Sequence, residues 1–279
     1  MRQIPVIATI REAYDFTFAN LGAIIGLIWM PMVLLSVGEF FIGQHYAQAV
    51  NEAMAAGNPN AAGPAALALF FFALASLGLY AMMLTAVTQL ALGQRQGGTM
   101  FHFAFGALEW RVFRNLFGLT LFLLPGALLL MLGMGRLGGA AGAIDVVAIG
   151  TVFALVAALV YFGVRLAAVL LPVVLHEEKQ ALVKSWSLSA GNFGRLLGVL
   201  AGAILPLYFA TLLVVAAIVG SALPQDTMPT PEQVAAVRNE NLPLLAGLSF
   251  LIAPLLIGLT VGASVFSWRK LTARTDIVA

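Results

Sequence analysis

The stretch Val164–Leu197, VRLAAVLLPVVLHEEKQALVKSWSLSAGNFGRLL, joins two long apolar segments through a short charged and amphipathic piece. It begins with a single arginine inside the first segment, passes a proline and a charged run, and enters the second segment at Gly191-Asn192. Long apolar runs separated by compact charged links are typical of membrane-spanning helices. The stretch therefore predicts an all-α protein that crosses a membrane several times.

The composition of the whole chain agrees with this interpretation. Apolar residues make up 61% of the 279 residues, charged residues only 9%, and the mean hydropathy is +0.99. Soluble domains contain about half apolar residues. The net charge of +2 and the lack of a Lys/Arg run give no reason to expect a nucleic-acid partner. The lack of cysteine excludes disulfides, thiolate metal sites and a cysteine nucleophile.

Six apolar segments are long enough to cross a bilayer core of roughly 30 Å as helices. The stretch AMAAGNPNAAGP (53–64) is rich in turn-forming residues and is expected to be a loop. The first span is expected to be retained, because charges precede it and the run Leu21–Gly38 is too long for a signal-peptide core. Residues 1–279 are interpreted as a single membrane domain with spans at 21–43, 65–92, 115–135, 146–172, 194–220 and 242–268.

The distribution of lysine and arginine predicts the orientation of the spans, since cytoplasmic loops carry an excess of both residues. One side of the predicted spans carries only Arg136 and Arg238, and Arg165 falls inside a span. Both termini are therefore expected on the cytoplasmic side. The cytoplasmic set consists of Arg2, Arg11, Arg95, Arg111, Arg114, Lys179, Lys184, Arg195, Arg269, Lys270 and Arg274.

One layout occurs three times: an amphipathic piece, an asparagine, a glycine and a span that holds a proline. The copies are YDFTFANLG with Pro31, EWRVFRNLFG with Pro125 and SWSLSAGNFG with Pro206. The layout predicts three parallel hairpin repeats, each preceded by an interfacial amphipathic helix on the cytoplasmic side. Alternatively, Asn and Gly are simply common at helix starts. The repeat units would be approximately 1–95, 96–176 and 177–279.

Each amphipathic piece carries an apolar face that is expected to lie in the headgroup plane. The faces are Ile7, Ile10, Tyr14 and Phe18 in residues 4–18; Phe101, Ala104, Leu108 and Val112 in residues 99–113; and Ala181, Leu182, Ser185 and Leu188 in residues 178–190.

Glycines spaced by four residues mark faces where helix backbones approach closely. We expect them to serve packing within the chain, with contact between copies of the chain as the alternative. The sets are Gly194/Gly198/Gly202, Gly22/Gly26 and Gly258/Gly262.

The opening stretch resembles a bacterial family. Its pattern is an arginine in a span, a proline, an acidic residue, an alanine and a Ser-Trp pair. A small residue followed by asparagine then begins the next span. These are Arg165, Pro172, Glu177 or Glu178, Ala181, Ser185-Trp186 and Asn192. The chain is similar here to the membrane domain of bacterial glycerophosphodiester phosphodiesterases and to YciC-like six-span inner-membrane proteins. The resemblance covers about thirty residues and implies a bacterial inner-membrane location. The phosphodiesterase activity belongs to a separate soluble barrel in that family, so it is not expected here.

Arg165 is the most informative single residue, because a charge inside a span is costly and suggests function by default. It is a candidate site for an anionic headgroup or a substrate phosphate. Alternatively it pairs with Glu177, Glu178 or a helix-end carbonyl and has a structural role. The candidate ligand- or lipid-binding residues are Arg165, Glu177, Glu178, Lys184 and Trp186.

Other chemistries find little support in the sequence. His176, with the two glutamates after it and with His102 and Glu109, lacks the spacing of a metal motif. Glu39, Asp145 and Arg136 lie near span ends and are interpreted as interface charges, possible partners in a salt bridge, rather than as a proton relay. The prolines of the odd spans lack the charged residues that follow them in mitochondrial carriers.

These observations favour a non-enzymatic inner-membrane protein that organises or supports other membrane components through lipid or protein contacts. The expected partners are membrane lipids, anionic inner-leaflet lipids above all, and a membrane protein or a second copy of the chain. No cofactor or metal is expected. The alternative is a transporter or channel for a small anionic or amphiphilic solute with Arg165 as its anchor. A polar cavity that converges on Arg165 would favour transport, and a bundle filled by apolar side chains would count against it.

Overall fold

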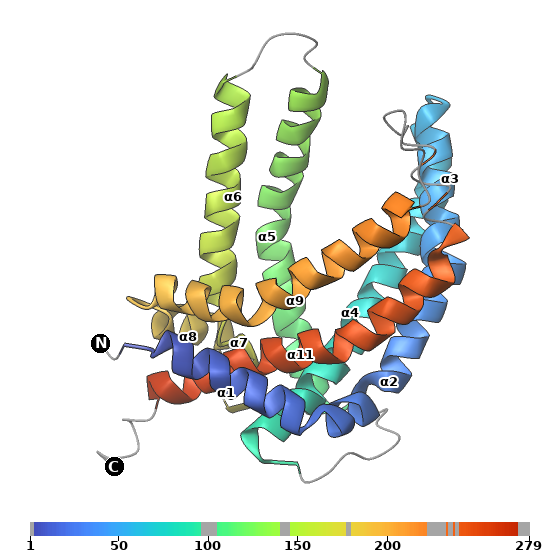
Figure 1. The fold of residues 1–279 in the computed structure, drawn as a ribbon. Coiled ribbons are helices and arrows are strands. Elements are labelled where there is room, and N and C mark those ends of the chain that lie inside the picture. Colours follow the sequence, from blue (N-terminus) through green and yellow to red (C-terminus); the bar gives the residue numbers. More distant parts are fainter. Residues whose placement is uncertain are drawn as a thin grey trace.

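In a computed structural model of the chain, the regular elements of the described residues are all helical (Figure 1). The structure describes residues 3–95, 105–139, 146–176, 180–221, 233, 237 and 240–272. Six helices are long and apolar enough to cross a membrane, which confirms an all-α, multi-pass fold. The elements are α1 (Val6–Ala19), α2 (Leu21–Gly38), the π-helical η1 (Glu39–Gly43), α3 (Gln44–Ala55), the 3-10 turn η2 (Pro59–Ala62), α4 (Gly63–Leu92), α5 (Ala107–Gly139), α6 (Val146–Ala167), α7 (Leu170–His176), α8 (Ala181–Leu188), α9 (Phe193–Ser221) and α11 (Leu242–Thr272).

Each predicted span falls on one of the six long helices, but the first span is longer than predicted. The run of α2, η1 and α3 continues past residue 43 to Ala55, because residues 44–55 contain no helix breaker. The loop expected over 53–64 is therefore reduced to a turn at 56–58 and to η2. The spans found by length and composition are Leu21–Ala53, Asn60–Leu92, Ala107–Met134, Val147–His176, Phe193–Ser221 and Pro243–Thr272.

The core of the bundle gathers around the short helix α7. Its residues Leu170 to Val174 are buried, and the helix contacts α4, α5, α8 and α11. Aliphatic side chains from the neighbouring helices fill the same cluster, among them Ile28 of α2, Val87 of α4 and Val265 of α11. Close packing of these side chains holds α7 in place, because apolar side chains within a membrane gain little from leaving equally apolar lipid.

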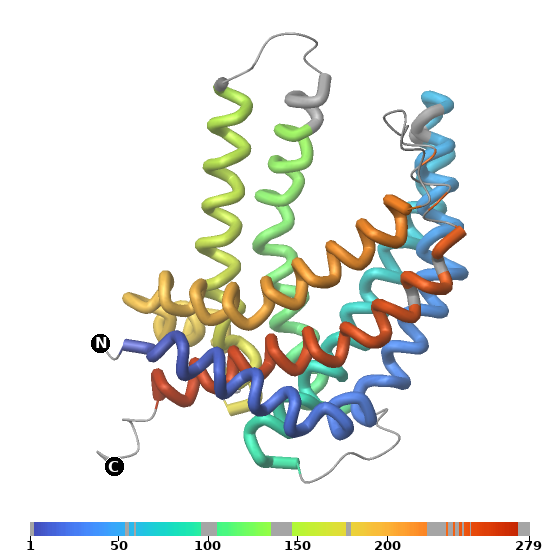
Figure 2. Tube along the Cα trace, in the orientation of Figure 1, coloured from blue at the N-terminus to red at the C-terminus, as the bar shows by residue number. Residues whose placement is uncertain are grey.

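Helix α1 lies along α11 and α9 (Figure 2). Glycines of both partners make room for it. A Cβ atom at Gly262 would lie 3.1 Å from the Cα of Ala13, and one at Gly258 would lie 2.7 Å from Cγ2 of Thr17. On α9, a Cβ atom at Gly202 would clash with Ile10. Two of the three predicted glycine sets therefore serve packing within the chain, as expected.

The face of α1 that packs against the protein is made of small residues and differs from the bulky apolar face that is expected at the headgroups. The buried residues are Thr9, Ala13 and Thr17, whereas the side chains of Ile7 and Phe18 are 84% and 60% exposed. Small residues form the packed face because packing between helices in an apolar medium depends on close approach, which they allow. Large apolar side chains can remain on the surface when that surface faces lipid.

The second amphipathic piece is not a separate helix over the part that the structure describes. Residues 107–113 form the first two turns of α5, which continues without interruption through Asn115 to Gly139. Residues 99–104 lie outside the described residues. The third piece does form the separate helix α8, and two residues of its expected headgroup face, Ala181 and Ser185, are buried within the protein.

The hairpin of α5 and α6 rises away from α9 and from the group formed by α2, α3 and α4 (Figure 1). In the apolar 18-residue stretch of each span, none of the residues of α5 and only 6% of those of α6 are buried. The corresponding fractions for the first and last spans are 28% and 29%. The exposed side chains are apolar, for example Leu128, Met131 and Phe153. This surface suits the hydrocarbon of a bilayer or another apolar helix, and not water.

An ion pair joins α1 to the end of α11. The Nζ atom of Lys270 lies 2.7 Å from Oε1 of Glu12, and each side chain is 36% exposed. Half-exposed pairs contribute about 0.5–1 kcal/mol to stability. A double-mutant cycle of Glu12→Gln and Lys270→Gln is expected to give a coupling energy in that range, measured by unfolding in mixed micelles at low salt. A coupling energy near zero would show that the pair contributes nothing.

Candidate functional site

Arg165 lies in the last turn of α6 and is bound by the helix that follows α7. Its Nε donates to Oγ of Ser189 (3.2 Å) and its Nη2 donates to the carbonyl of Trp186 (2.7 Å). Its Nη1 donates to the hydroxyl of Tyr161 (3.0 Å) one turn earlier on α6. All three nitrogens of the guanidinium group therefore have partners in the protein. The carbonyl of Trp186 lies near the C-terminal end of α8, where carbonyls lack helical partners and cations are favoured.

Two serines, one in α8 and one directly after it, also join this segment to α6 through their hydroxyl groups. The hydroxyl of Ser185 donates to the carbonyl of Leu166 (2.7 Å), and that of Ser189 lies 3.0 Å from the carbonyl of Arg165. These carbonyls belong to the last turn of α6, and both serines are fully buried. Serines four residues apart lie on one helix face, which explains why both reach α6. The sequence analysis did not select Ser189, although its spacing from Ser185 was visible.

Trp186 lies directly against Arg165. The guanidinium carbon lies 3.6 Å from the centroid of the indole ring, a cation–π contact. The indole also stacks on Phe162, with centroids 5.7 Å apart and ring planes 16° apart. Tyr161 meets the indole edge-on at 6.0 Å. Arg165 therefore fixes both the position of α8 and the orientation of the Trp186 ring.

A groove of about 430 Å³ opens beside this ring, between α5, α6 and α8. Apart from Gly118, its lining is made of apolar and aromatic side chains. Gly118 leaves the groove open, because a Cβ atom there would meet only one neighbour, Cδ1 of Leu182, at 3.7 Å. The lining residues are Gly118, Leu119, Phe122, Phe162, Leu166, Leu182, Val183 and Trp186.

The predicted site residues are brought together only in part. Arg165 and Trp186 are in contact, whereas Lys184 lies on a different side of α8, since two residues correspond to about 200° around a helix. Glu177 and Glu178 lie outside the described residues. Two basic residues that were not selected, Arg111 and Arg114, share the groove-facing side of α5, because they precede Gly118 by seven and four residues.

Two of the residues considered for other chemistry have local structural partners. Nδ1 of His176 lies 2.8 Å from the carbonyl of Pro172, and its ring packs on Trp268. Glu109 accepts a hydrogen bond from the backbone N–H of Gly106 (2.9 Å) at the start of α5, as in a capping box. His102, Asp145 and the side chain of Arg136 lie outside the described part of the chain.

No family model matches this chain, and no curated protein or solved structure matches it either. The resemblance to the phosphodiesterase membrane domain and to YciC-like proteins stays a prediction.

Proposed function

We propose that this chain is a non-enzymatic membrane protein that binds an anionic lipid in the groove beside Trp186 and acts as an accessory or organising protein. The observation that carries the proposal is the groove itself, which is apolar along its lining and has arginines on the helix face that leads to it. This arrangement matches the two parts of a lipid, with the acyl chain on the apolar lining and the headgroup at the basic residues.

The geometry of α5 supports this orientation of the lipid. Arg114 and Arg111 precede Gly118 by four and seven residues, or roughly 6 and 10 Å along a helix. They lie toward the N-terminal end of α5, the end with the positive helix dipole, which also favours a negative headgroup. Basic residues near an anionic leaflet contribute about 1 kcal/mol each. The acyl chain would then extend from the headgroup toward Phe122 and the centre of the bilayer.

The same proposal covers the location and topology of the chain. The distribution of lysine and arginine supports an orientation with both termini cytoplasmic, and the resemblance to bacterial inner-membrane proteins implies that membrane. The exposed Ile7 and Phe18 of α1 support its contact with the lipid interface. The separate helices α1 and α8 before α2 and α9 support a repeated unit, and the continuous α5 is a departure from it.

The hydrogen bonds of Arg165 count against its use as the anchor of a transported anion. A guanidinium group whose three nitrogens and ring face are already occupied would have to leave those partners to bind a solute. The groove next to it is apolar, whereas transport of an anion would require a polar path. Arg165 is therefore proposed as a positioning residue that holds Trp186 at the groove.

Filling the groove is expected to remove the bound lipid. Gly118→Leu places a branched side chain in the groove while leaving every charged residue in place, and it should reduce phosphatidylglycerol retention about tenfold. The measurement is native mass spectrometry of protein taken from vesicles of phosphatidylglycerol and phosphatidylethanolamine. Gly22→Leu is the matched control, because nothing lies within 4 Å of a Cβ atom at Gly22.

The proposal predicts that Arg114→Gln reduces retention of phosphatidylglycerol more than retention of phosphatidylethanolamine, since only the first headgroup carries net negative charge. Equal retention of both lipids by wild type, or equal loss in Gly118→Leu and Gly22→Leu, would contradict the proposed site.

A further inference from the structure

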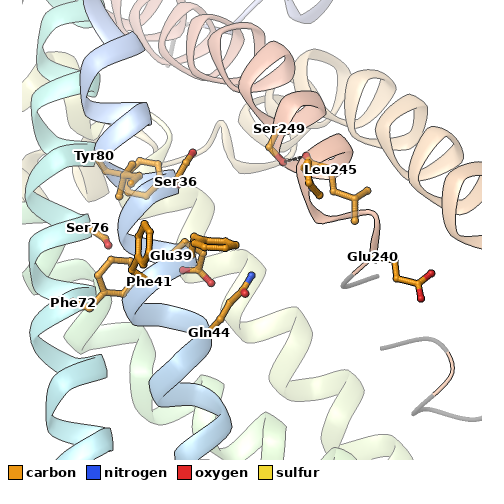
Figure 3. Close-up of a pocket in the computed structure, with 13 residues that line it drawn as sticks. Ser36, Glu39, Phe41, Gln44, Phe72, Ser76, Tyr80, Glu240, Leu245 and Ser249 are labelled. Carbon is orange, nitrogen blue, oxygen red and sulfur yellow. Dashed lines mark hydrogen bonds between the residues drawn. The ribbon is translucent and has the colours of Figure 1, made fainter. Parts of the chain in front are cut away.

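A second cavity lies in another part of the bundle, between the end of α2, η1, α4 and the start of α11 (Figure 3). Its volume is about 990 Å³, at the upper end of the range for small-molecule sites. Glu39 is 18 residues after Leu21, or roughly 27 Å along a helix, so the cavity lies near the opposite end of the first span from α1. It shares no lining residue with the groove beside Trp186.

The carboxylate of Glu39 is placed at this cavity by the local backbone. Glu39 begins the π-helical turn η1, a distortion that often occurs at functional sites. Its side chain lies over the buried Gly43 four residues later, where a Cβ atom would be 2.7 Å from Oε2 of Glu39. The absence of a side chain at Gly43 is therefore what allows the carboxylate to occupy this position.

Four aromatic residues line the cavity together with Glu39. Phe40, Phe41, Phe72 and Tyr80 line the cavity, and Figure 3 shows Glu39 next to Phe41 and Phe72. Phe72 approaches the α2 backbone closely, because a Cβ atom at Gly38 would lie 2.5 Å from its Cε2. Aromatic faces attract cations through their negative quadrupole, and a carboxylate adds a full opposite charge.

The charged residues in the rest of the lining also favour a cation over an anion. The polar side chains of the lining include Ser76 and Ser249, and Glu240 lies at the far edge of the cavity, where Figure 3 shows its carboxylate pointing away from Glu39. Among the described residues that line the cavity, every charged side chain is acidic. A cationic amphiphile would bring an opposite charge to the Glu39 carboxylate, whereas a neutral or anionic amphiphile would not.

We propose that this cavity binds an amphiphilic organic cation, with the charged centre at Glu39 and the apolar body against the aromatic rings. The ligand class follows from the combination of the Glu39 carboxylate, four aromatic residues in the lining and a volume that accommodates a molecule of drug size. An amphiphile can reach the cavity from the bilayer, because Glu39, Phe40 and Phe41 lie on the exposed surface of the first span.

The test uses two probes of nearly equal size and opposite charge, tetraphenylphosphonium and tetraphenylborate. Equilibrium dialysis against the full chain in nanodiscs measures binding of each probe, after subtraction of empty nanodiscs. Wild type is expected to bind the cation saturably. Glu39→Gln keeps the shape of the side chain, removes its charge and should weaken cation binding about tenfold. Binding of tetraphenylborate should not weaken.

Glu52→Gln is the matched control, because it removes the same charge from the same helical run at an exposed position of α3 outside the cavity lining. It should leave cation binding unchanged. Gly43→Ala provides a second variant, which retains both carboxylates but displaces that of Glu39, and it should weaken cation binding less than Glu39→Gln does. Equal effects of Glu39→Gln and Glu52→Gln, or equal saturable binding of the two probes by wild type, would overturn the proposal.

Discussion

Replacing Gly262 with leucine is expected to lower the unfolding free energy by about 3 kcal/mol, the upper end of the usual cost of overpacking. Even a Cβ atom at this position would lie 3.1 Å from Cα and 3.3 Å from the carbonyl oxygen of Ala13. Both of these atoms belong to the backbone of α1, so no side-chain rotation can relieve the contact. Helix α1 must then move away from α11, which also separates Glu12 from Lys270 and Tyr14 from the carbonyl of Ala203.

Unfolding by SDS in mixed micelles measures this loss. Limited digestion with trypsin provides an independent readout, because cleavage after the exposed Arg11 should become faster when α1 is released. Gly22→Leu is again the control, since it changes a glycine of the same spacing type that has no neighbour within 4 Å. Similar stability of Gly262→Leu and Gly22→Leu would mean that the close contact between α1 and α11 does not hold the fold.

Removing the side chain of Arg165 is expected to have an effect of comparable size. Arg165→Ala deletes three hydrogen bonds and the contact with the Trp186 ring, and it leaves the carbonyl of Trp186 with the Ser189 hydroxyl as its remaining side-chain donor. Hydrogen bonds to charged groups contribute about 1.5–3 kcal/mol each and do not add fully. The expected loss of stability is therefore roughly 2–4 kcal/mol. Measurement is by the same unfolding assay.

Arg165→Lys separates the contribution of the guanidinium geometry to stability from that of the positive charge. Lysine keeps the positive charge but lacks the planar fork that reaches three partners and stacks on the indole, so it should recover less than half of the loss. Arg11→Ala is the control for charge removal, because the Arg11 side chain is 83% exposed and pairs only loosely with Asp15 at 3.7 Å. An Arg165→Ala variant that keeps wild-type stability but loses binding of an anion would favour the transport alternative.

The sequence predicted the elements of the fold far better than their arrangement. Apolar runs of about twenty residues require helices in lipid, so the six spans and the all-α class follow from composition alone. The glycine spacing on α9 and α11 also predicted packing faces correctly. It did not identify α1 as the helix that occupies both faces, because small residues show only that something approaches closely.

For the candidate site as well, the sequence identified individual residues better than their arrangement. The sequence singled out Arg165 and Trp186 because a charge in a span and an aromatic ring at its boundary stand out against an apolar background. It missed Ser189, Arg111 and Arg114, whose roles depend on which helix faces meet. It also associated Lys184 with the site, although Lys184 lies on another side of α8.

What the sequence by itself determined is therefore the class of the protein, the number of spans and the few residues whose presence in an apolar chain requires a reason. Hydrophobic patterning along the chain is a one-dimensional property and needs no tertiary contact. Only the tertiary structure decided that Thr9, Ala13 and Thr17 form the packed face of α1. It also showed that the guanidinium group of Arg165 donates hydrogen bonds to Trp186 and Ser189, and that Glu39 lines a cavity. Each of these depends on the close approach of segments that are distant in the sequence, and in a membrane that approach is governed by shape and hydrogen bonding more than by hydrophobicity.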